Sequence, residues 1–393
     1  MTTIDSNVDV STILAAVAEI APQLRENGAR AEQERRTPAE TIELLERAGV
    51  YRMTTPRRFG GLELPVADQV KVYQEISRAD PAAGWVSMIW STSTWVHTLL
   101  SEKAQEEIFT RESTRVSTGF TPSGTVEPAE GGWVLNGVWK WMSGIHGSHW
   151  VTVAAVQMTP DGPAPYVAVV PVSDVTIIDD WNTGAAEGTG SASVKAEGVF
   201  VPAHRVLFLP ELLGAGAADR ANSGATGRNY AFIPYFMAAG SSPFLGIAKG
   251  AYDLFLDRLP GRGITYTPWT NQSESPVTHI QVATAKNKIA AAEALSANWL
   301  GLIQAHADAG TAPTVEERAE VRGQTAYSIQ LAKEAVEVLY TASGASVVSR
   351  DVPFQRFHRD INGLSLHALY LLNANLELHG RVILGLSPDT PFL

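Results

Sequence analysis

Cysteine is absent from the 393 residues of this chain. Without cysteine the protein forms no disulfide, has no thiolate nucleophile, and binds no zinc ion or iron–sulfur cluster through sulfur ligands. Any catalysis or cofactor binding therefore depends on oxygen and nitrogen groups.

Basic residues are fewer than acidic residues in this chain. Lysine and arginine total 30 against 41 aspartate and glutamate residues, which gives a formal net charge of −11. Binding to nucleic acids or to anionic membrane surfaces depends on clustered positive charge, so the composition argues against both partners.

Long apolar runs are also missing. No stretch approaches the roughly 18 apolar residues that a membrane-spanning helix requires, and the first nine residues are polar and acidic. We therefore expect a cytoplasmic protein that does not bind membranes.

Several catalytic signatures are missing as well. The chain has no Walker-type loop, no Rossmann glycine fingerprint and no Gly-x-Ser-x-Gly elbow, so we do not expect it to oxidise NAD(P)H on its own. His146 and His149 are close in sequence, but a third ligand is lacking nearby. We predict no metal site.

The hydrophobic pattern divides the chain into three parts and predicts a mainly α, α+β fold. Residues 1–115 show the three-to-four spacing of an N-terminal helical domain. Short β-rich runs in 116–211 predict a small antiparallel β-barrel or sandwich, with a hairpin turn at Asn136-Gly137. Residues 212–393 predict a C-terminal four-helix bundle. It begins with a Gly- and Ala-rich segment, 212–229, which we interpret as a mobile loop or active-site lid.

Local sequence motifs add more specific information than the order of domains alone. Phe-Thr-Pro-Ser-Gly at 120–124 precedes Gly-Trp-Val-Leu-Asn-Gly at 132–137 and Trp-Lys-Trp-Met-Ser-Gly at 139–144. With Phe-Gly-Gly at 59–61 and Arg359-Asp360, these motifs resemble the acyl-CoA dehydrogenase superfamily over essentially the whole chain. The resemblance implies the acyl-CoA dehydrogenase-like fold with a flavin against the β domain.

The same resemblance implies five cofactor-binding residues. Trp141 and Ser143 would lie beside the isoalloxazine, with the Ser143 hydroxyl on flavin N5; a hydroxyl suits that position because it both donates and accepts. Ser123 belongs to the segment that lines the flavin. Arg262 resembles a residue that reaches the flavin phosphates of a neighbouring subunit. Gly344 lies where the superfamily has a Gly-Gly step on the dinucleotide tail, and this departure leaves FAD and FMN both open.

The segment after Arg359-Asp360 points to one branch of the superfamily. About two turns on, many dehydrogenases have a Tyr-Glu pair whose Glu is the base, whereas this chain has His367-Ala368 on the expected helix. A histidine here is similar to the flavin-dependent monooxygenases of this fold, the oxygenase components of two-component hydroxylases. In that group a separate NAD(P)H:flavin reductase supplies reduced FAD or FMN, and O2 forms a C4a-hydroperoxyflavin that hydroxylates the substrate.

Two residues are predicted to be catalytic on this basis. His367 would handle a proton on the peroxide or on the substrate, because imidazole ordinarily titrates near neutral pH. Ser143 would retain the N5 proton and so prevent premature loss of peroxide.

Four residues are predicted to bind substrate: Trp90, Ser93, His97 and Tyr235. Several phenol hydroxylases of the group place a histidine where Ser93 stands, which puts a simple phenol in doubt. The aromatic side chains still favour a flat substrate such as a phenol, an indole or a polycyclic natural product.

Three alternatives stay open. The chain could be an acyl-CoA dehydrogenase or oxidase with a displaced base, an amine N-oxygenase on the same fold, or a silent scaffold protein. The resemblance also implies a homotetramer, while the substrate, its site of oxygenation and the reductase are not identified by the residues.

Overall fold

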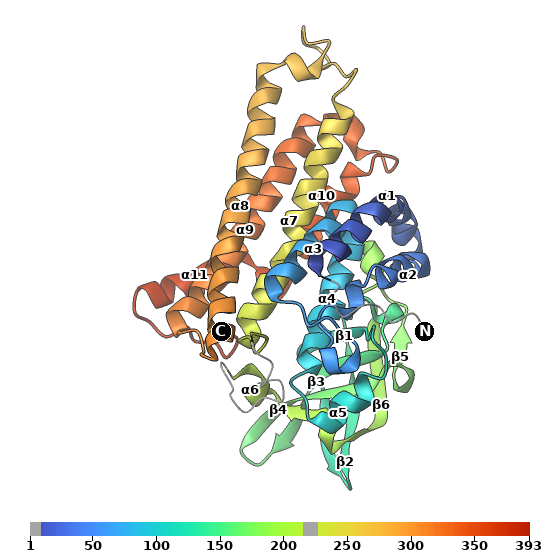
Figure 1. Ribbon diagram of the computed structural model, residues 1–393, viewed down its shortest axis with the longest axis vertical. Coiled ribbons are helices and arrows are strands. Elements are labelled where there is room, and N and C mark those ends of the chain that lie inside the picture. Colours follow the sequence, from blue (N-terminus) through green and yellow to red (C-terminus); the bar gives the residue numbers. More distant parts are fainter. Residues whose placement is uncertain (1–8, 215–226) are drawn as a thin grey trace.

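The computed structural model describes residues 9–214 and 227–393. Most of the predicted segment 212–229 therefore lies outside the described residues. Long helices stand above a strand-rich lower part, and shorter N-terminal helices pack beside both (Figure 1). No helix in the described ranges is long and apolar enough to cross a membrane.

The N-terminal part is helical, as predicted. Its helices are α1 (Val10–Glu34), α2 (Ala39–Arg47), α3 (Val66–Ala79), α4 (Pro81–His97) and α5 (Glu102–Ile108). Helix α4 begins at a favourable sequence signal, because the Asp80 side chain accepts a hydrogen bond from the Ala83 amide and Pro81 occupies the first turn. Nearly every residue of α4 is buried, so this helix forms the centre of the molecule rather than its surface.

The middle part is one seven-stranded sheet with the order β5-β6-β2-β1-β3-β4-β7. The strands are β1 (Val116–Ala129), β2 (Gly132–Trp139), β3 (Trp150–Thr159), β4 (Gly162–Pro171), β5 (Thr176–Ile178), β6 (Ser193–Pro202) and β7 (Val206–Phe208). The pairing is antiparallel except between β1 and β3, which run parallel. This parallel pair differs from the wholly antiparallel domain that the sequence predicted.

The predicted turn at Asn136-Gly137 is wrong. Both residues lie inside β2, where they pair with Thr125 and Gly124 of β1, and the register against β6 shifts at this point. The Asn136 side chain accepts a hydrogen bond from the Gly198 amide at this irregularity (2.6 Å). A β-bulge uses the same permissive residues as a hairpin turn, so the local signal marked the bulge. The actual turn between β1 and β2 contains Gly131, with φ of 76°.

The C-terminal part is a helical bundle, as predicted. It contains α7 (Phe232–Arg258), α8 (Pro276–Ala309), α9 (Val315–Ala342), α10 (Phe354–Leu364) and α11 (Leu372–Ile383), preceded by the short α6 (Leu209–Leu213). A capping box between Thr314 and Glu317 starts α9. The predicted domain boundary at 211/212 falls within α6, and the one at 115/116 falls at the start of β1.

Candidate active site

Ser143 lies in the connection between β2 and β3, and its hydroxyl is already hydrogen-bonded. The indole Nε1 of Trp85 donates to Ser143 Oγ (3.1 Å), and Ser143 Oγ lies 2.9 Å from Ser191 Oγ. The Ser117 hydroxyl holds the Ser143 carbonyl from β1 (2.9 Å). Three elements therefore fix the predicted N5 ligand.

Trp141, two residues earlier, has an unusual conformation. Its φ is 65°, in the left-handed region that residues other than glycine rarely adopt. The side chain is 66% exposed and meets Trp181 edge-on at 5.4 Å. A strained backbone that presents a large aromatic ring to solvent is typical of a ligand site.

His367 does not lie on a helix, which corrects the predicted placement. Helix α10 ends at Leu364, and His367 instead caps the short 3₁₀ helix η9 (Ala368–Tyr370) by accepting the Leu369 amide on Nδ1 (3.3 Å). The side chain is exposed, yet surrounding protein atoms lower its pKa to about 4 through desolvation. The neighbouring rings of Trp85 and Tyr370 are among the protein atoms around it.

The lowered pKa also changes the role expected of His367, which was predicted from the near-neutral pKa of free imidazole. At neutral pH the imidazole is uncharged. Because Nδ1 accepts from a backbone amide, the single ring proton belongs on Nε2. A neutral ring with this tautomer can donate a hydrogen bond from Nε2.

Trp85 connects the two predicted catalytic residues. The same indole that donates to Ser143 packs against the ring of His367 (5.8 Å between centroids) and the ring of Tyr370 (6.2 Å). Trp85 is 3% exposed and sits one turn into α4. The sequence alone does not single out Trp85, because no spacing rule links it to positions so distant in the chain.

A second face of α4 has polar atoms without partners. Among the described residues, Ser93 Oγ, His97 Nδ1 and Thr118 Oγ1 are buried and lack a hydrogen bond. Ser93 and His97 lie one turn apart on α4, and His97 Nε2 bonds Thr152 Oγ1 (2.7 Å). Thr152 pairs with Thr118 in the sheet. Burial lowers the pKa of His97 to about 3, so it is neutral.

Trp90 and Tyr235 are engaged in the core. Trp90 donates to Ser148 Oγ (2.9 Å) and is 1% exposed. The Tyr235 hydroxyl donates to Gln69 Oε1 (2.8 Å), and its ring lies 4.2 Å from that of Trp95. Their predicted contact with substrate stays a prediction, and these partners favour a structural role for both.

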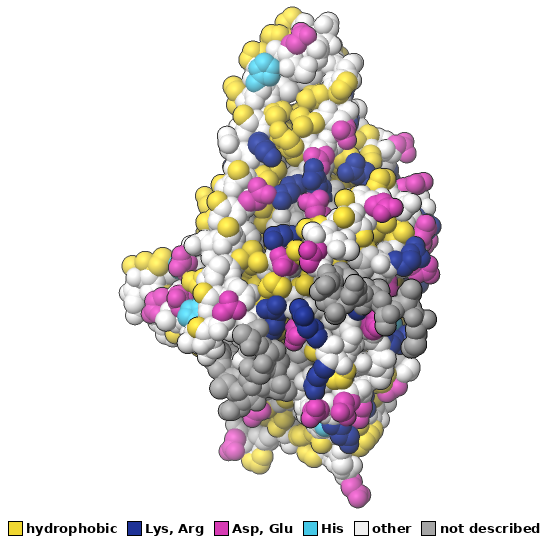
Figure 2. Space-filling view, viewed as in Figure 1, with side chains coloured by type: hydrophobic (Ala, Val, Ile, Leu, Met, Phe, Trp, Pro, Cys, Tyr) yellow, Lys and Arg dark blue, Asp and Glu magenta, His cyan; other side chains and the backbone are white. Residues whose placement is uncertain are grey.

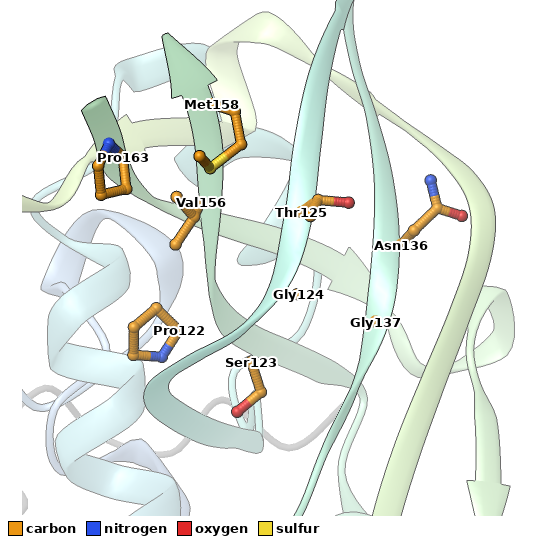
Figure 3. Close-up of a pocket in the computed structure, with 9 residues that line it drawn as sticks. All are labelled: Pro122, Ser123, Gly124, Thr125, Asn136, Gly137, Val156, Met158 and Pro163. Carbon is orange, nitrogen blue, oxygen red and sulfur yellow. The ribbon is translucent and has the colours of Figure 1, made fainter. Parts of the chain in front are cut away.

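Ser123 lines an open groove of about 640 Å³ on the β domain (Figure 3). The groove is formed by β1, β2, β3 and β4, and its lining residues are Pro122, Ser123, Gly124, Thr125, Asn136, Gly137, Val156, Met158 and Pro163. Gly124 and Gly137 pair with each other here, and each is packed so closely that an added Cβ would meet the ring of Trp139 within 3 Å.

Arg262 and Gly344 lie together but away from Ser143. Arg262 donates to the Ser343 carbonyl (2.7 Å), next to Gly344, whose φ is 65°. Arg262 belongs to the connection between α7 and α8, and Gly344 to the connection between α9 and α10. The connection between α7 and α8 lies at the upper end of the bundle, opposite the β domain (Figure 1).

His146 and His149 show no metal-binding arrangement. His149 Nδ1 accepts from the Arg115 amide, and burial, reinforced by the charge of Arg115, lowers its pKa to about 4. Within residues 9–214 and 227–393 no group of three or more His, Asp or Glu side chains could hold a metal ion.

Three of the predicted site residues have chemistry that suits a flavin. Trp141 offers an exposed flat ring, Ser143 keeps a lone pair beyond its two hydrogen bonds, and His367 is exposed beside Trp85. The fold and this site define a flavoprotein of the acyl-CoA dehydrogenase class. Residues 11–112 match the family described as "Acyl-CoA dehydrogenase, N-terminal domain", and residues 238–371 match "Acyl-CoA dehydrogenase, C-terminal domain".

Comparison with individual relatives assigns the chain to a smaller group within this class. The FADH(2)-dependent resorcinol hydroxylase, oxygenase component, of Rhizobium sp. is 30% identical over 96% of this chain and 95% of its own. The oxygenase subunit HsaA of Rhodococcus jostii, a flavin-dependent monooxygenase, is 30% identical over 89% of this chain and 92% of its own. The structure of XiaF from Streptomyces sp. with FADH2 and glycerol has a TM-score of 0.93, with 27% identity and 98% coverage of both chains. The chain belongs to the flavin-dependent monooxygenases with the acyl-CoA dehydrogenase fold.

Proposed function

We propose that this chain is the oxygenase component of a two-component monooxygenase that hydroxylates an aromatic or heteroaromatic compound with reduced FAD or FMN and O2. The observation that carries the proposal is the joint placement of Ser143 and His367 around Trp85. Bound reduced flavin supplies two electrons, so that one oxygen atom enters the substrate and the other leaves as water.

The two catalytic side chains have separate tasks. Ser143, held rigidly by its own hydrogen bonds, would accept a hydrogen bond from the N5–H group of a bound reduced flavin and so help to retain that hydrogen on N5. His367 donates from Nε2 to an oxygen on which negative charge develops during transfer. Trp141 provides a flat face for the isoalloxazine.

The substrate would bind beside α4. Ser93, His97 and Thr118 each have a buried polar atom without a partner, and a ligand hydroxyl or ring nitrogen would satisfy them. Phe120 follows Thr118 by two residues on β1, where the pairing with β3 becomes irregular after Gly119. It meets Phe236 of α7 edge-on at 5.8 Å, which gives an aromatic wall next to the polar atoms. This combination favours a flat substrate with one polar group, such as a phenol, an indole or a polycyclic natural product.

The partners follow from the same role. A separate NAD(P)H:flavin reductase would supply the reduced flavin, as the term oxygenase component implies for the relatives. A homotetramer would bring Arg262 and Gly344 of one chain to the flavin of another, where the guanidinium suits a phosphate.

Exposed apolar side chains support association of chains. On α8, Val277 is 59% and Ile280 is 67% exposed, and near the end of α11, Ile383 is 71% and Leu384 is 77% exposed. Hydrophobic side chains are visible along the upper part of the bundle (Figure 2). Burial of such surface is the usual driving force for stable oligomers. A cytoplasmic location stays a prediction.

The decisive experiment is anaerobic mixing of the protein with reduced FAD or FMN, followed by rapid mixing with O2 while flavin absorbance is recorded. We expect an absorbing species that differs from both reduced and oxidised flavin and outlives the free-flavin reaction. Direct conversion to oxidised flavin at the rate of free flavin would contradict the proposal. A panel of phenols, indoles and tricyclic aromatics under ¹⁸O2 then identifies the product by mass.

The three alternative functions predict different experimental results. An acyl-CoA dehydrogenase would purify with oxidised FAD that an acyl-CoA bleaches. When amines are added to the panel, an amine N-oxygenase would incorporate ¹⁸O only into those amines. A silent scaffold would show wild-type behaviour for His367→Ala and Ser143→Ala in every assay.

A further inference from the structure

A chain of hydroxyl groups leads away from Ser143 into the loop before β6. Ser143 Oγ lies 2.9 Å from Ser191 Oγ, which lies 2.7 Å from Thr189 Oγ1. Thr189 Oγ1 in turn donates to the Ala186 carbonyl (2.8 Å). These side chains are buried: Ser143 is 8%, Ser191 is 5% and Thr189 is 1% exposed.

The two ends of the chain fix the direction of every hydrogen in it. A carbonyl only accepts, so the Thr189 hydrogen points to Ala186. Thr189 must then accept from Ser191, and Ser191 must accept from Ser143. An indole nitrogen only donates, so Trp85 fills one lone pair of Ser143. The Ser143 hydrogen is thereby directed to Ser191, and the one capacity left on its oxygen is a second lone pair.

This orientation discriminates between the two redox states of a flavin. N5 of reduced flavin carries a hydrogen and donates, whereas N5 of oxidised flavin only accepts. We propose that Trp85, Ser191 and Thr189 are positioning residues that hold Ser143 as a pure hydrogen-bond acceptor and so make the site select reduced flavin. The inference rests on the proposed function, because it takes Ser143 to face N5.

The acceptor at the end of the chain is held from the C-terminal domain. Asp360 of α10 accepts a hydrogen bond from the Ala186 amide (2.6 Å), and Arg359 donates to the Gly184 carbonyl (2.9 Å). Ala186 itself has φ of 55°, a conformation that needs such support. The Arg-Asp pair that resembles the superfamily motif therefore fixes the loop that orients Ser143.

The experiment compares the wild-type protein with Thr189→Val, Thr189→Ser and Ser191→Ala. Valine has the shape of threonine without its hydroxyl, so Ser191 loses its acceptor and is free to turn its hydrogen towards Ser143. In Ser191→Ala the acceptor of the Ser143 hydrogen is removed directly. In both variants Ser143 gains the freedom to donate to N5. Ser148→Ala is the matched control, because it breaks a similar Trp–Ser bond, to Trp90, outside this chain of hydroxyls.

The measured quantity is the ratio of the dissociation constants of oxidised and reduced flavin, the latter determined anaerobically by fluorescence titration. We expect the preference for reduced flavin to fall three- to tenfold in Thr189→Val and Ser191→Ala, about the contribution of one hydrogen bond. A tenfold fall corresponds to a decrease of about 30 mV in the potential of the bound two-electron couple. Thr189→Ser should restore the wild-type ratio, and Ser148→Ala should leave it unchanged.

Each outcome decides between two explanations. A ratio that stays at the wild-type value in Thr189→Val or Ser191→Ala overturns the inference, and so does a loss in Thr189→Ser equal to that in Thr189→Val. If the valine variant does not fold, Ser191→Ala alone decides. A wild-type protein that binds no reduced flavin refutes the proposed function instead, since the variants then have nothing to discriminate.

Discussion

The two sides of the site differ in how their polar atoms are satisfied. On the strand side, Ser143 is joined to Trp85 and Ser191 by hydrogen bonds that run on into the protein. On the α4 side, Ser93 Oγ and His97 Nδ1 are buried without a partner in the described structure. In a cofactor site, the protein can pair its own polar atoms before the cofactor binds. A substrate site instead keeps unpaired polar atoms, which form hydrogen bonds with the substrate. The difference is consistent with the proposal that the flavin binds beside Ser143 and the substrate beside Ser93 and His97.

The largest expected effect tests whether the chemistry depends on the strand side. His367 contacts that side through the ring of Trp85. We expect His367→Ala to lower the rate of product formation about 100-fold, the usual loss for a group that handles a proton, while flavin binding and the melting temperature change little. Product analysis under excess reduced flavin measures the effect. Unchanged coupled turnover would remove His367 from the catalytic residues, and His367→Gln, which retains a donor, should lie between the two.

The next effect isolates the cofactor contact. Ser143→Ala removes the acceptor for the N5 hydrogen, so the reduced flavin should react with O2 without forming product, and the absorbing species should decay about tenfold faster. The rate of hydrogen peroxide release in the absence of substrate measures this loss. Ser143→Thr keeps a hydroxyl and should retain most of the lifetime. A lifetime in Ser143→Ala equal to that of the wild type would place the N5 contact at another residue.

The sequence supported the prediction of Ser143 and His367 because each lies in a short motif. It did not reveal Trp85, since its partners Ser143 and His367 come from the β domain and from the segment after α10. Ser191 and Thr189 lie in a Gly-rich turn without any recognisable pattern, and only tertiary packing shows that their hydroxyls meet. Long-range hydrogen bonds of this kind have no local signature, whereas helical periodicity does.

The failures at Asn136-Gly137 and His367 have a common physical cause. In both places a local preference competes with tertiary structure. Strand pairing on both sides of β2 converts a turn signal into a bulge, and α10 ends before His367, so the register counted along a helix did not apply. The residue types were informative, but their backbone geometry was not predictable from neighbours alone.

A smaller effect is expected at two buried serines that differ in their hydrogen bonding. Ser93 on α4 is 1% exposed with an unpartnered Oγ, whereas Ser117 on β1 is 0% exposed and donates to the Ser143 carbonyl. Ser117→Ala should destabilise the protein by about 1 kcal/mol, while Ser93→Ala should leave stability unchanged or raise it. With substrate present, Ser93→Ala should increase KM several-fold without affecting flavin affinity. Denaturant unfolding and steady-state kinetics test both statements, and equal destabilisation by the two substitutions would show that Ser93 is satisfied in solution.

The smallest effect concerns the anchor of the strand side, Asp360. Burial, opposed by the Ala186 amide and by Arg356 and Arg359 but reinforced by Asp80, raises the pKa of Asp360 to about 7. Between about pH 4 and pH 7 the folded protein therefore retains a proton that the unfolded chain has lost, so this group makes stability fall as the pH rises through that window and adds no slope above it.

Asp360→Asn removes this titration and retains an oxygen that accepts from the Ala186 amide. We expect its melting temperature to change less between pH 5 and pH 8 than that of the wild type. Asp179→Asn, which removes a carboxylate that is 66% exposed, serves as the control and should keep the wild-type slope. A slope in Asp360→Asn identical to that of the wild type would mean that Asp360 stays ionised across this range. The anchor would then be a charged member of the Arg356 and Arg359 network, and the loop that orients Ser143 would be held by ion pairs rather than by a protonated acid.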